Sequence, residues 1–518
     1  MRESNRSGSA VVPGLGGDRA EATGRSALWL WAILTAVTAV EVVLTWPQTQ
    51  RFIAFMYGDP GANLALVVLL RGGARAMVDF AYNYGLLSAL AGDLWFRAFG
   101  LSAWAFGLFV VLGMLLTTAS VARFTAAVRP AASGLALTIV TLQFAVLPMA
   151  HFAQVLEPVL ISAALAWHAR GRRPAALAAL TAACAVKPAL AYVYGLVLLV
   201  MTLRDLAARR ATAAEVVRAL APATACAVAL AIVLTAIYGP TSLARTILPT
   251  SGASTYTVNN VGFFRGSGRL FWDPTGRRIG YYLGTCVGIW FLSTFALILA
   301  GAAAGWRWLR GTSAPCDRCR DEVIVACTVF HVVYVCAAWG GPHGWVYYNY
   351  VLFLGVAAAT AVSRPLARFT WVVVVLALPP LVNAGRAHLI DWRTYSPAAE
   401  TAGLWSSTQE RADWARARSL TQGLRTVVFA HQGGGAATLY PNLAGPVGLM
   451  YNKGMALPVE VERKARQIAG VDAVITTNYL KPASDVIDLF PEIRAVLAGF
   501  ERTDVGEYLV VFRRRPPR

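Results

Sequence analysis

Charged residues are scarce in this chain. Asp, Glu, Lys and Arg make up 14% of its 518 residues and hydrophobic residues 57%, whereas soluble globular domains carry about 25% charged residues. This balance excludes a soluble enzyme and predicts that most of the chain lies in lipid. The net charge is +19, but the arginines form short tracts between apolar runs and do not line one basic face, so we expect no nucleic-acid partner.

Lysine is almost absent. The only lysine before Lys453 is Lys187, which ends an apolar segment in the sequence Val-Lys-Pro. Alternatively, the ammonium group of Lys187 could simply extend to the membrane interface. Arginine would serve that purpose equally well, and almost every other basic residue in this part of the chain is arginine. Lys187 is therefore a candidate functional residue.

The seven cysteines are scattered and none follows Cys336, so we predict no structural disulfide in the tail. Cys316 and Cys319 form a CxxC in an arginine-rich loop, but a structural zinc site needs four ligands and the sequence offers no further pair nearby. We interpret these residues as reduced cytosolic thiols and predict no metal site.

Apolar stretches of about 20 residues can cross a bilayer as helices. A shorter pair flanks Lys187, and counting both gives about eleven spans. Residues 1–26 are predicted to be a disordered cytoplasmic N-terminus, followed by an uncleaved first span. The predicted spans are 28–46, 101–124, 130–149, 153–169, 174–187, 189–203, 219–238, 279–303, 323–340, 345–362 and 370–386.

The arginine tracts predict the orientation, because short basic loops stay in the cytoplasm. Successive spans cross the membrane in opposite directions. If the N-terminus is cytoplasmic, every arginine tract then lies on the cytoplasmic side, including those around Arg123, Arg170, Arg204, Arg307 and Arg364. Residues 27–386 then form the membrane domain, and residues 387–518 lie outside with two long loops, 47–100 and 239–278.

Amphipathic stretches at 59–70 and 82–99 in the first outer loop are typical of helices that lie along a membrane surface. The tail alternates apolar strands at 426–430, 473–476 and 508–512 with charged helical segments at 458–468 and 487–498. The predicted fold class is therefore an all-α polytopic membrane protein with a small C-terminal α/β domain.

Ionisable residues at the outer face are candidates for function, because charge near a bilayer is costly. Asp59, within Gly-Asp-Pro-Gly, could equally cap a helix. Glu157 precedes Pro158 at the expected start of a span, where the helix dipole alone would favour an acid. The outer-facing candidates are Asp59, Asp79, Glu157, Lys187, Arg265, Arg269 and Asp273.

The order of these features resembles the GT-C superfamily of polyprenyl-phosphate-sugar glycosyltransferases, which includes aminoarabinose lipid A transferases and protein mannosyltransferases. The features are Asp59 soon after the first span, the loop ending in Leu-Trp-Phe-Arg-Ala-Phe-Gly, the pair Glu157-Pro158, and Lys187 at the end of the fifth span. Many members carry an Asp-Glu pair in this loop, whereas this chain has the single carboxylate of Asp59.

The resemblance implies an inverting transfer of a sugar from a polyprenyl phosphate to a lipid or cell-envelope glycan, at the outer (periplasmic) face of a bacterial cytoplasmic membrane. It implies that Asp59 is the general base and that Lys187, Arg265 and Arg269 hold the donor phosphate. No cofactor is certain, and a divalent cation at Asp59 is considered. The candidates for binding sugar or acceptor hydroxyls are Asp79, Tyr82, Tyr84, Glu157, His151 and His343.

Two other functions fit parts of the sequence. A transporter or lipid flippase would also have many spans, but the two halves show no internal repeat and the acids gather at one face. A noncatalytic scaffold would leave Asp59 and Lys187 unexplained.

Overall fold

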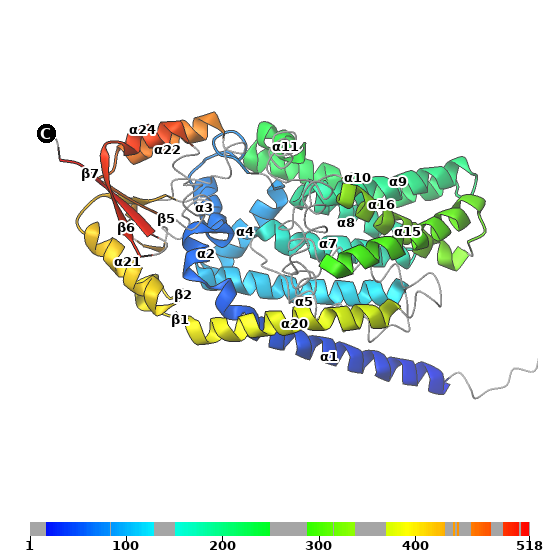
Figure 1. Ribbon diagram of the computed structural model, residues 1–518. Coiled ribbons are helices and arrows are strands. Elements are labelled where there is room, and N and C mark those ends of the chain that lie inside the picture. The colour runs from blue at the N-terminus through cyan, green and yellow to red at the C-terminus, as the bar shows by residue number, and fades with distance from the viewer. Residues whose placement is uncertain are drawn as a thin grey trace, which may run out of the picture.

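The computed structural model describes residues 17–82, 84–128, 151–248, 287–313, 315–336, 369–429, 439–440, 443–444, 457–477, 490–506 and 509–516. Apolar sequences form long helices in the first part, and β-branched sequences form a sheet near the C-terminus (Figure 1). The elements are α1 (Gly17–Thr49), α2 (Phe52–Tyr57), α3 (Asp59–Arg71), α4 (Leu86–Phe99), α5 (Ala103–Val128), α7 (Phe152–Ala169), α8 (Arg173–Val186), α9 (Pro188–Ala207), α10 (Ala213–Tyr238), α11 (Pro240–Ile247), α15 (Val287–Arg310), α16 (Pro315–Cys336), α20 (Phe369–Thr394), β1 (Ser396–Pro397), η1 (Ala399–Thr401), β2 (Trp405–Ser406), α21 (Thr408–Leu420), β3 (Thr426–Val428), β4 (Leu443–Ala444), α22 (Pro458–Ala469), β5 (Ala473–Thr477), α24 (Pro491–Leu497), β6 (Phe500–Val505) and β7 (Leu509–Arg514).

The long helices form a bundle. Each predicted span within the described residues coincides with a helix, and the predicted spans at 130–149 and 345–362 lie outside the described residues. Among the described helices, four are long and apolar enough to cross a membrane: 31–49, 103–128, 152–169 and 213–238. The total of eleven spans stays a prediction.

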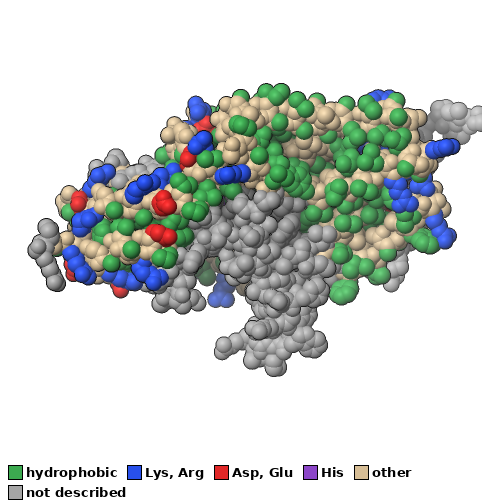
Figure 2. Space-filling view, turned by 90° about the horizontal axis from the view of Figure 1, so that it is seen from above, with side chains coloured by type: hydrophobic (Ala, Val, Ile, Leu, Met, Phe, Trp, Pro, Cys, Tyr) green, Lys and Arg blue, Asp and Glu red, His purple; other side chains and the backbone are tan. Residues whose placement is uncertain are grey.

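The described arginine tracts lie at one end of the bundle, which we call the arginine end. Arg170 donates to the backbone oxygen of Arg123 at the end of α5. Arg210, after α9, donates to the carbonyl of Trp308 near the end of α15, and Arg318 of α16 pairs with Asp205 of α9. Figure 2 shows Lys and Arg side chains at both ends of the molecule, including a group at the end farthest from the sheet. The common location agrees with the predicted topology, and the assignment of this end to the cytoplasm stays a prediction.

The first outer loop forms the predicted helices α3 and α4. Leu64, Ala65, Leu66 and Val67 of α3 are fully or almost fully buried, so α3 is part of the protein core. α4 begins at Leu86, four residues later than the sequence pattern suggested, and is bounded by Gly85 and Gly100. The location of both helices on a membrane surface stays a prediction.

The described strands β3 to β7 form a mixed sheet in the order β4-β3-β5-β7-β6. β3 is parallel to β4 and to β5, whereas β7 is antiparallel to β5 and to β6. The tail therefore has the predicted combination of strands and helices. Helix α20 continues to Thr394, past residue 387 where the predicted tail domain begins.

Alternate residues of the strands pack on opposite faces of this sheet, as the period of a β-strand requires. Val427, Val474 and Val510 share one apolar cluster with α22 and α24. Val428, Ile475 and Val511 share another cluster with Trp414 of α21 and with the first outer loop. The ring of Trp414 lies 5.4 Å from that of Phe52 in α2, so the apolar core continues from the sheet into the membrane domain.

We call the five-stranded sheet with helices α21, α22 and α24 the sheet domain. Polar contacts also hold the sheet domain to the first outer loop. The carboxylate of Glu460 in α22 accepts a 2.8 Å hydrogen bond from the backbone N–H of Ala81. The backbone N–H of Trp405 donates to the carbonyl of Gln50 at 2.9 Å, and Arg51 pairs with Glu410 of α21 at 3.8 Å. The sheet thus lies at the end of the bundle opposite the arginine end (Figure 1).

Candidate functional site

A proline fixes the backbone at Lys187. Pro188 disfavours helical geometry for the residue before it, and Lys187 is extended, with φ −155° and ψ 103°, between the end of α8 and the start of α9. The N–H of Gly85 in the first outer loop donates a 2.8 Å hydrogen bond to the carbonyl of Val186. The sequence prediction of a helix break beside Lys187 is confirmed.

Glu157 is the acidic partner of Lys187. The Nζ atom of Lys187 lies 3.3 Å from Oε2 of Glu157, and the residues are 7% and 1% exposed. Two charges this far from water must compensate each other, because an isolated buried charge is very costly. The two residues, taken as separate candidates from the sequence, therefore form one unit.

The expected position of Glu157 at the start of its helix is wrong. α7 begins at Phe152, so Glu157 and Pro158 lie inside the helix. The N-cap residue is His151, whose backbone N–H donates to Oε1 of Gln154 at 3.1 Å. This contact, typical of a capping box, starts the helix earlier. The helix dipole therefore does not explain Glu157, and its pairing with Lys187 does.

Aromatic side chains enclose the same pair. Nζ of Lys187 lies 5.9 Å from the ring centroid of Tyr84, a distance suited to a cation–π contact. The Tyr84 ring lies 4.7 Å from that of His151 and 5.7 Å from that of Tyr82. The Tyr82 hydroxyl is 2.7 Å from Oγ of Ser88, and burial raises the pKa of Tyr82, so this phenol stays protonated. We call Tyr82, Tyr84, His151, Glu157 and Lys187 the Lys187 cluster.

The start of α3 lies beside this cluster. Oδ1 of Asn63 accepts a 3.2 Å hydrogen bond from the backbone N–H of Phe152, the residue after His151. Asp59 is the first residue of α3, after the N-cap residue Gly58, and positions four apart share one face of a helix. The backbone of Asp59 is thus one turn from a contact with α7, whereas its side chain lies outside the described residues.

The described contacts of Asp79 are with residues outside the Lys187 cluster. Its Oδ2 atom accepts hydrogen bonds from the backbone N–H and the Nε–H of Arg75, at 2.8 and 3.2 Å. Partial burial raises the pKa of Asp79, but the hydrogen bonds and charge of Arg75, with a contribution from the charge of Arg463, lower it below the ordinary value. Asp79 is thus an ionised residue of the loop that faces α22.

Three predicted site residues, Arg265, Arg269 and His343, lie outside the described residues, as does Asp273. Their predicted roles stay predictions. Two residues that the sequence analysis missed, Asn63 and Gln154, hold the starts of α3 and α7 together with the cluster. The spacing His-x-x-Gln was the available signal for Gln154.

The sequence analysis also missed a polar cluster at the arginine end. Nitrogen, sulfur and oxygen ligand atoms of His168, Cys319 and Glu322 lie within 4.8 Å of one another, although the residues come from α7 and α16. The sequence offered no further ligand-type residues near Cys319, because helix packing brings together residues that are far apart in sequence. Nε2 of His168 is 2.6 Å from Oε2 of Glu322, and Nη2 of Arg173 is 2.5 Å from Oε1.

No protein-family model and no curated protein sequence matches the chain. Among solved structures, the chain is similar to ArnT from Cupriavidus metallidurans bound to undecaprenyl phosphate, with a TM-score of 0.50 and 15% identity over 95% of this chain and 98% of that one. The apo state of the same ArnT matches with a TM-score of 0.41, 15% identity and the same coverage.

The long match to the first ArnT structure covers the helical bundle and the C-terminal sheet in one alignment. At 15% identity it establishes the fold. The fold that the sequence resemblance implied is thereby confirmed: this chain is a multi-pass membrane protein with the fold of ArnT.

Proposed function

We propose that this protein is an inverting glycosyltransferase that moves a sugar from a polyprenyl-phosphate donor to a lipid or cell-envelope glycan acceptor. The observation that carries the proposal is the buried Lys187 cluster beside the start of α3, in a chain with the ArnT fold. The similar ArnT structure is bound to undecaprenyl phosphate, a lipid of the proposed donor class. We place the reaction at the outer face of a bacterial cytoplasmic membrane, with the N-terminus inside.

Lys187 is proposed to bind the donor phosphate. An ammonium group has three N–H donors, so it can hold Glu157 and a phosphate oxygen at the same time. Burial excludes water and strengthens this attraction. Glu157 acts as a positioning residue that keeps the ammonium in place, and Arg265 and Arg269 are proposed as bidentate partners of the same phosphate.

Asp59 is proposed as the general base. The acceptor hydroxyl oxygen forms a bond to the anomeric carbon on one side while the bond from that carbon to the phosphate oxygen breaks on the other, which inverts the centre. The hydroxyl proton passes to the Asp59 carboxylate. The lipid phosphate departs as a stable anion, so it needs positive charge and no general acid. Asp59 is also the candidate ligand for a divalent cation, and no step here depends on one.

The remaining candidates are proposed to bind hydroxyl groups. Tyr82, Tyr84 and His151 present ring faces and polar atoms beside Lys187, and aromatic faces suit the apolar side of a sugar. Asp79 and His343 complete this group. Asp79 lies in the first outer loop, where its carboxylate pairs with Arg75.

The test uses the purified full chain in detergent, a panel of radiolabelled polyprenyl-phosphate sugars and crude envelope lipid. We expect transfer by the wild type and its loss in Asp59→Asn and Lys187→Ala. Asp317→Asn is the matched control, since Asp317 pairs with Arg320 at the arginine end and should retain full transfer. Unchanged transfer in Asp59→Asn would remove Asp59 as base. Absence of transfer from every donor would favour the transporter function.

A further inference from the structure

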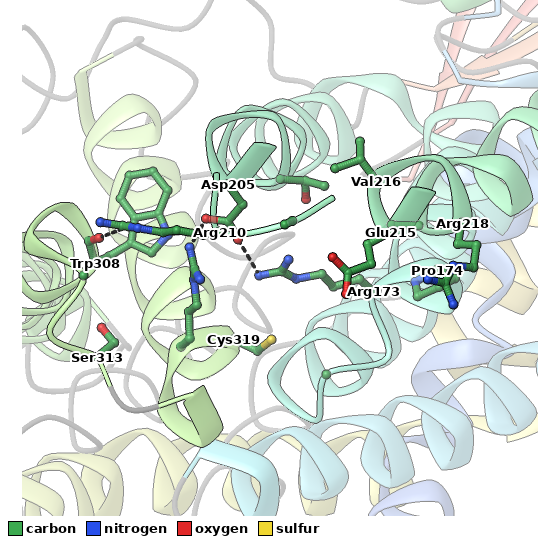
Figure 3. Close-up of a pocket in the computed structure, with 16 residues that line it drawn as sticks. Arg173, Pro174, Asp205, Arg210, Glu215, Val216, Arg218, Trp308, Ser313 and Cys319 are labelled. Carbon is green, nitrogen blue, oxygen red and sulfur yellow. Dashed lines mark hydrogen bonds and ion pairs between the residues drawn. The ribbon is translucent and has the colours of Figure 1, made fainter. Parts of the chain in front are cut away.

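A large cavity lies at the arginine end. It measures about 900 Å³ and lies between α8, α9, α10, α15 and α16, with the side chains shown in Figure 3. Four of its lining residues are arginines, and two are acids. The arginines are Arg173, Arg210, Arg218 and Arg318, and the acids are Asp205 and Glu215.

Two of the arginines are neutralised by acids. Arg173 lies 3.1 Å from Asp205, and Arg318 pairs with the same carboxylate. Both arginines also approach Glu322, at 2.5 and 3.7 Å. These contacts join α8, α9 and α16 at the cavity wall.

The other two arginines supply positive charge in excess. Arg210 donates to the carbonyls of Trp308 and Leu309 at 2.9 and 3.3 Å, and Nε of Arg218 donates to the carbonyl of Ala214. In the part of the chain that the structure describes, neither guanidinium lies within ion-pair distance of an acid, although the charge of Arg218 acts on the Glu215 carboxylate in the same lining. A carbonyl does not neutralise a guanidinium, so Arg210 keeps its charge for an external anion and Arg218 keeps part of its own.

One helix start adds to the positive potential of this space. Helix α8 begins beside the cavity at Arg173, and the N-terminal end of a helix attracts anions. The start of α10 is already capped by Thr212 and the Glu215 carboxylate.

An exposed apolar face of α10, which we call the α10 groove, begins at the same turns that line this cavity. Val216 and Ala219 line the cavity, whereas Val217 and Leu220 belong to the α10 groove. The groove continues to Ile232, and its described lining residues all come from α10. A basic cavity that opens onto an apolar strip matches a molecule with a charged head and a hydrocarbon tail.

We propose that this cavity binds the phosphate headgroup of an anionic phospholipid, with an acyl chain along α10. The arginine end is the predicted cytoplasmic end, where anionic lipids are abundant and basic pockets between helices bind their headgroups. Arg210 and Arg218 contact the phosphate. A metal ion at His168, Cys319 and Glu322 fits less well, because both oxygens of Glu322 already face nitrogen partners.

The test is native mass spectrometry of the delipidated full chain in neutral detergent, with added phosphatidylglycerol or phosphatidylcholine. We expect preferential binding of phosphatidylglycerol, and a loss of about tenfold in its affinity in the double variant Arg210→Gln/Arg218→Gln. Arg172→Gln/Arg209→Gln is the matched control, because these two exposed arginines lie at the same end outside the cavity lining, and it should retain the wild-type affinity.

Two results would overturn the proposal. Equal losses in the two double variants would show diffuse attraction to the basic end of the protein. Equal binding of the two lipids by the wild type would show that the headgroup charge is not recognised.

A separate experiment measures thermal unfolding with added glycerol phosphate or with the lipid. Equal protection by the two would assign the cavity to a soluble phosphate and refute the role of the α10 groove.

Discussion

Lys187 and Glu157 form a charge pair within the protein, with Nζ 3.3 Å from Oε2 and almost no exposure of either residue. The pair joins the break between α8 and α9 to the second turn of α7. A buried pair of this kind can be structural, catalytic or both. The two roles differ in what happens when both charges are removed together.

The first prediction separates these roles. Lys187→Met alone leaves the Glu157 carboxylate without this buried partner and should lower the free energy of unfolding by about 3–5 kcal/mol. Lys187→Met/Glu157→Gln removes both charges and should recover most of that loss, yet remain inactive because the donor phosphate has lost its cation. Thermal unfolding in detergent and the transfer assay measure the two effects. A double variant that is stable and active would assign the pair a structural role only.

The second prediction concerns the close approach of Gly85 to the end of α8. A Cβ atom at Gly85 would lie 1.9 Å from the carbonyl oxygen of Ala185, which is backbone and cannot rotate away. Gly85→Ala should therefore displace the loop that carries Tyr84, lower stability by about 1–3 kcal/mol and reduce transfer.

Gly195→Ala is the control for this change. No atom lies within 4 Å of the position of its Cβ in α9, and alanine favours helix over glycine by about 1 kcal/mol. It should be neutral or stabilising and fully active. If Gly85→Ala behaved like Gly195→Ala, the loop would not depend on this approach to α8.

The helices and several strands could be predicted from the sequence because their signals are local. About twenty apolar residues are needed to cross a bilayer, and short apolar runs between charged helical segments marked β3, β5 and β7. Lys187 was also identifiable, as the only lysine in the first 452 residues. These features depend on residue composition and on the lengths of apolar runs, both of which can be read from the sequence without knowledge of tertiary contacts.

The contacts of the site depend on tertiary packing and could not be predicted in the same way. Glu157 and Lys187 are thirty residues apart and meet because α7 and α8 are packed neighbours. The contact of Glu460 with Ala81 joins positions 379 residues apart. Glu157 was placed at the start of its helix because Pro158 was given more weight than the cap at His151 and Gln154.

The third prediction concerns the apolar contact between the sheet domain and the bundle. Trp414 of α21 is 1% exposed and packs between Phe52 of α2 and Tyr440. Trp414→Ala should lower the free energy of unfolding by about 3–5 kcal/mol and increase protease cleavage of the sheet domain. Trp306→Ala is the control, since Trp306 is 56% exposed. Cleavage of Trp414→Ala at the wild-type rate would contradict a shared core.

The fourth prediction concerns Lys464 in α22, which is 1% exposed and lies 2.8 Å from Oε1 of Glu460. Burial lowers the pKa of Lys464 from 10.5 to about 8, while the charge of Glu460 opposes this shift. Between about pH 8 and pH 10.5 the unfolded chain therefore binds more protons at this residue than the folded chain does.

The Lys464 contribution to stability should accordingly rise with pH across that window, by at most about 1.4 kcal/mol per pH unit, and be constant below it. Other groups titrate at alkaline pH, so the quantity to measure is the difference in stability between the wild type and Lys464→Met at each pH, by thermal unfolding. This difference should change in favour of the wild type from pH 8 to pH 10. A difference that stays flat would mean that Lys464 has an ordinary pKa and that its ammonium is not buried beside Glu460.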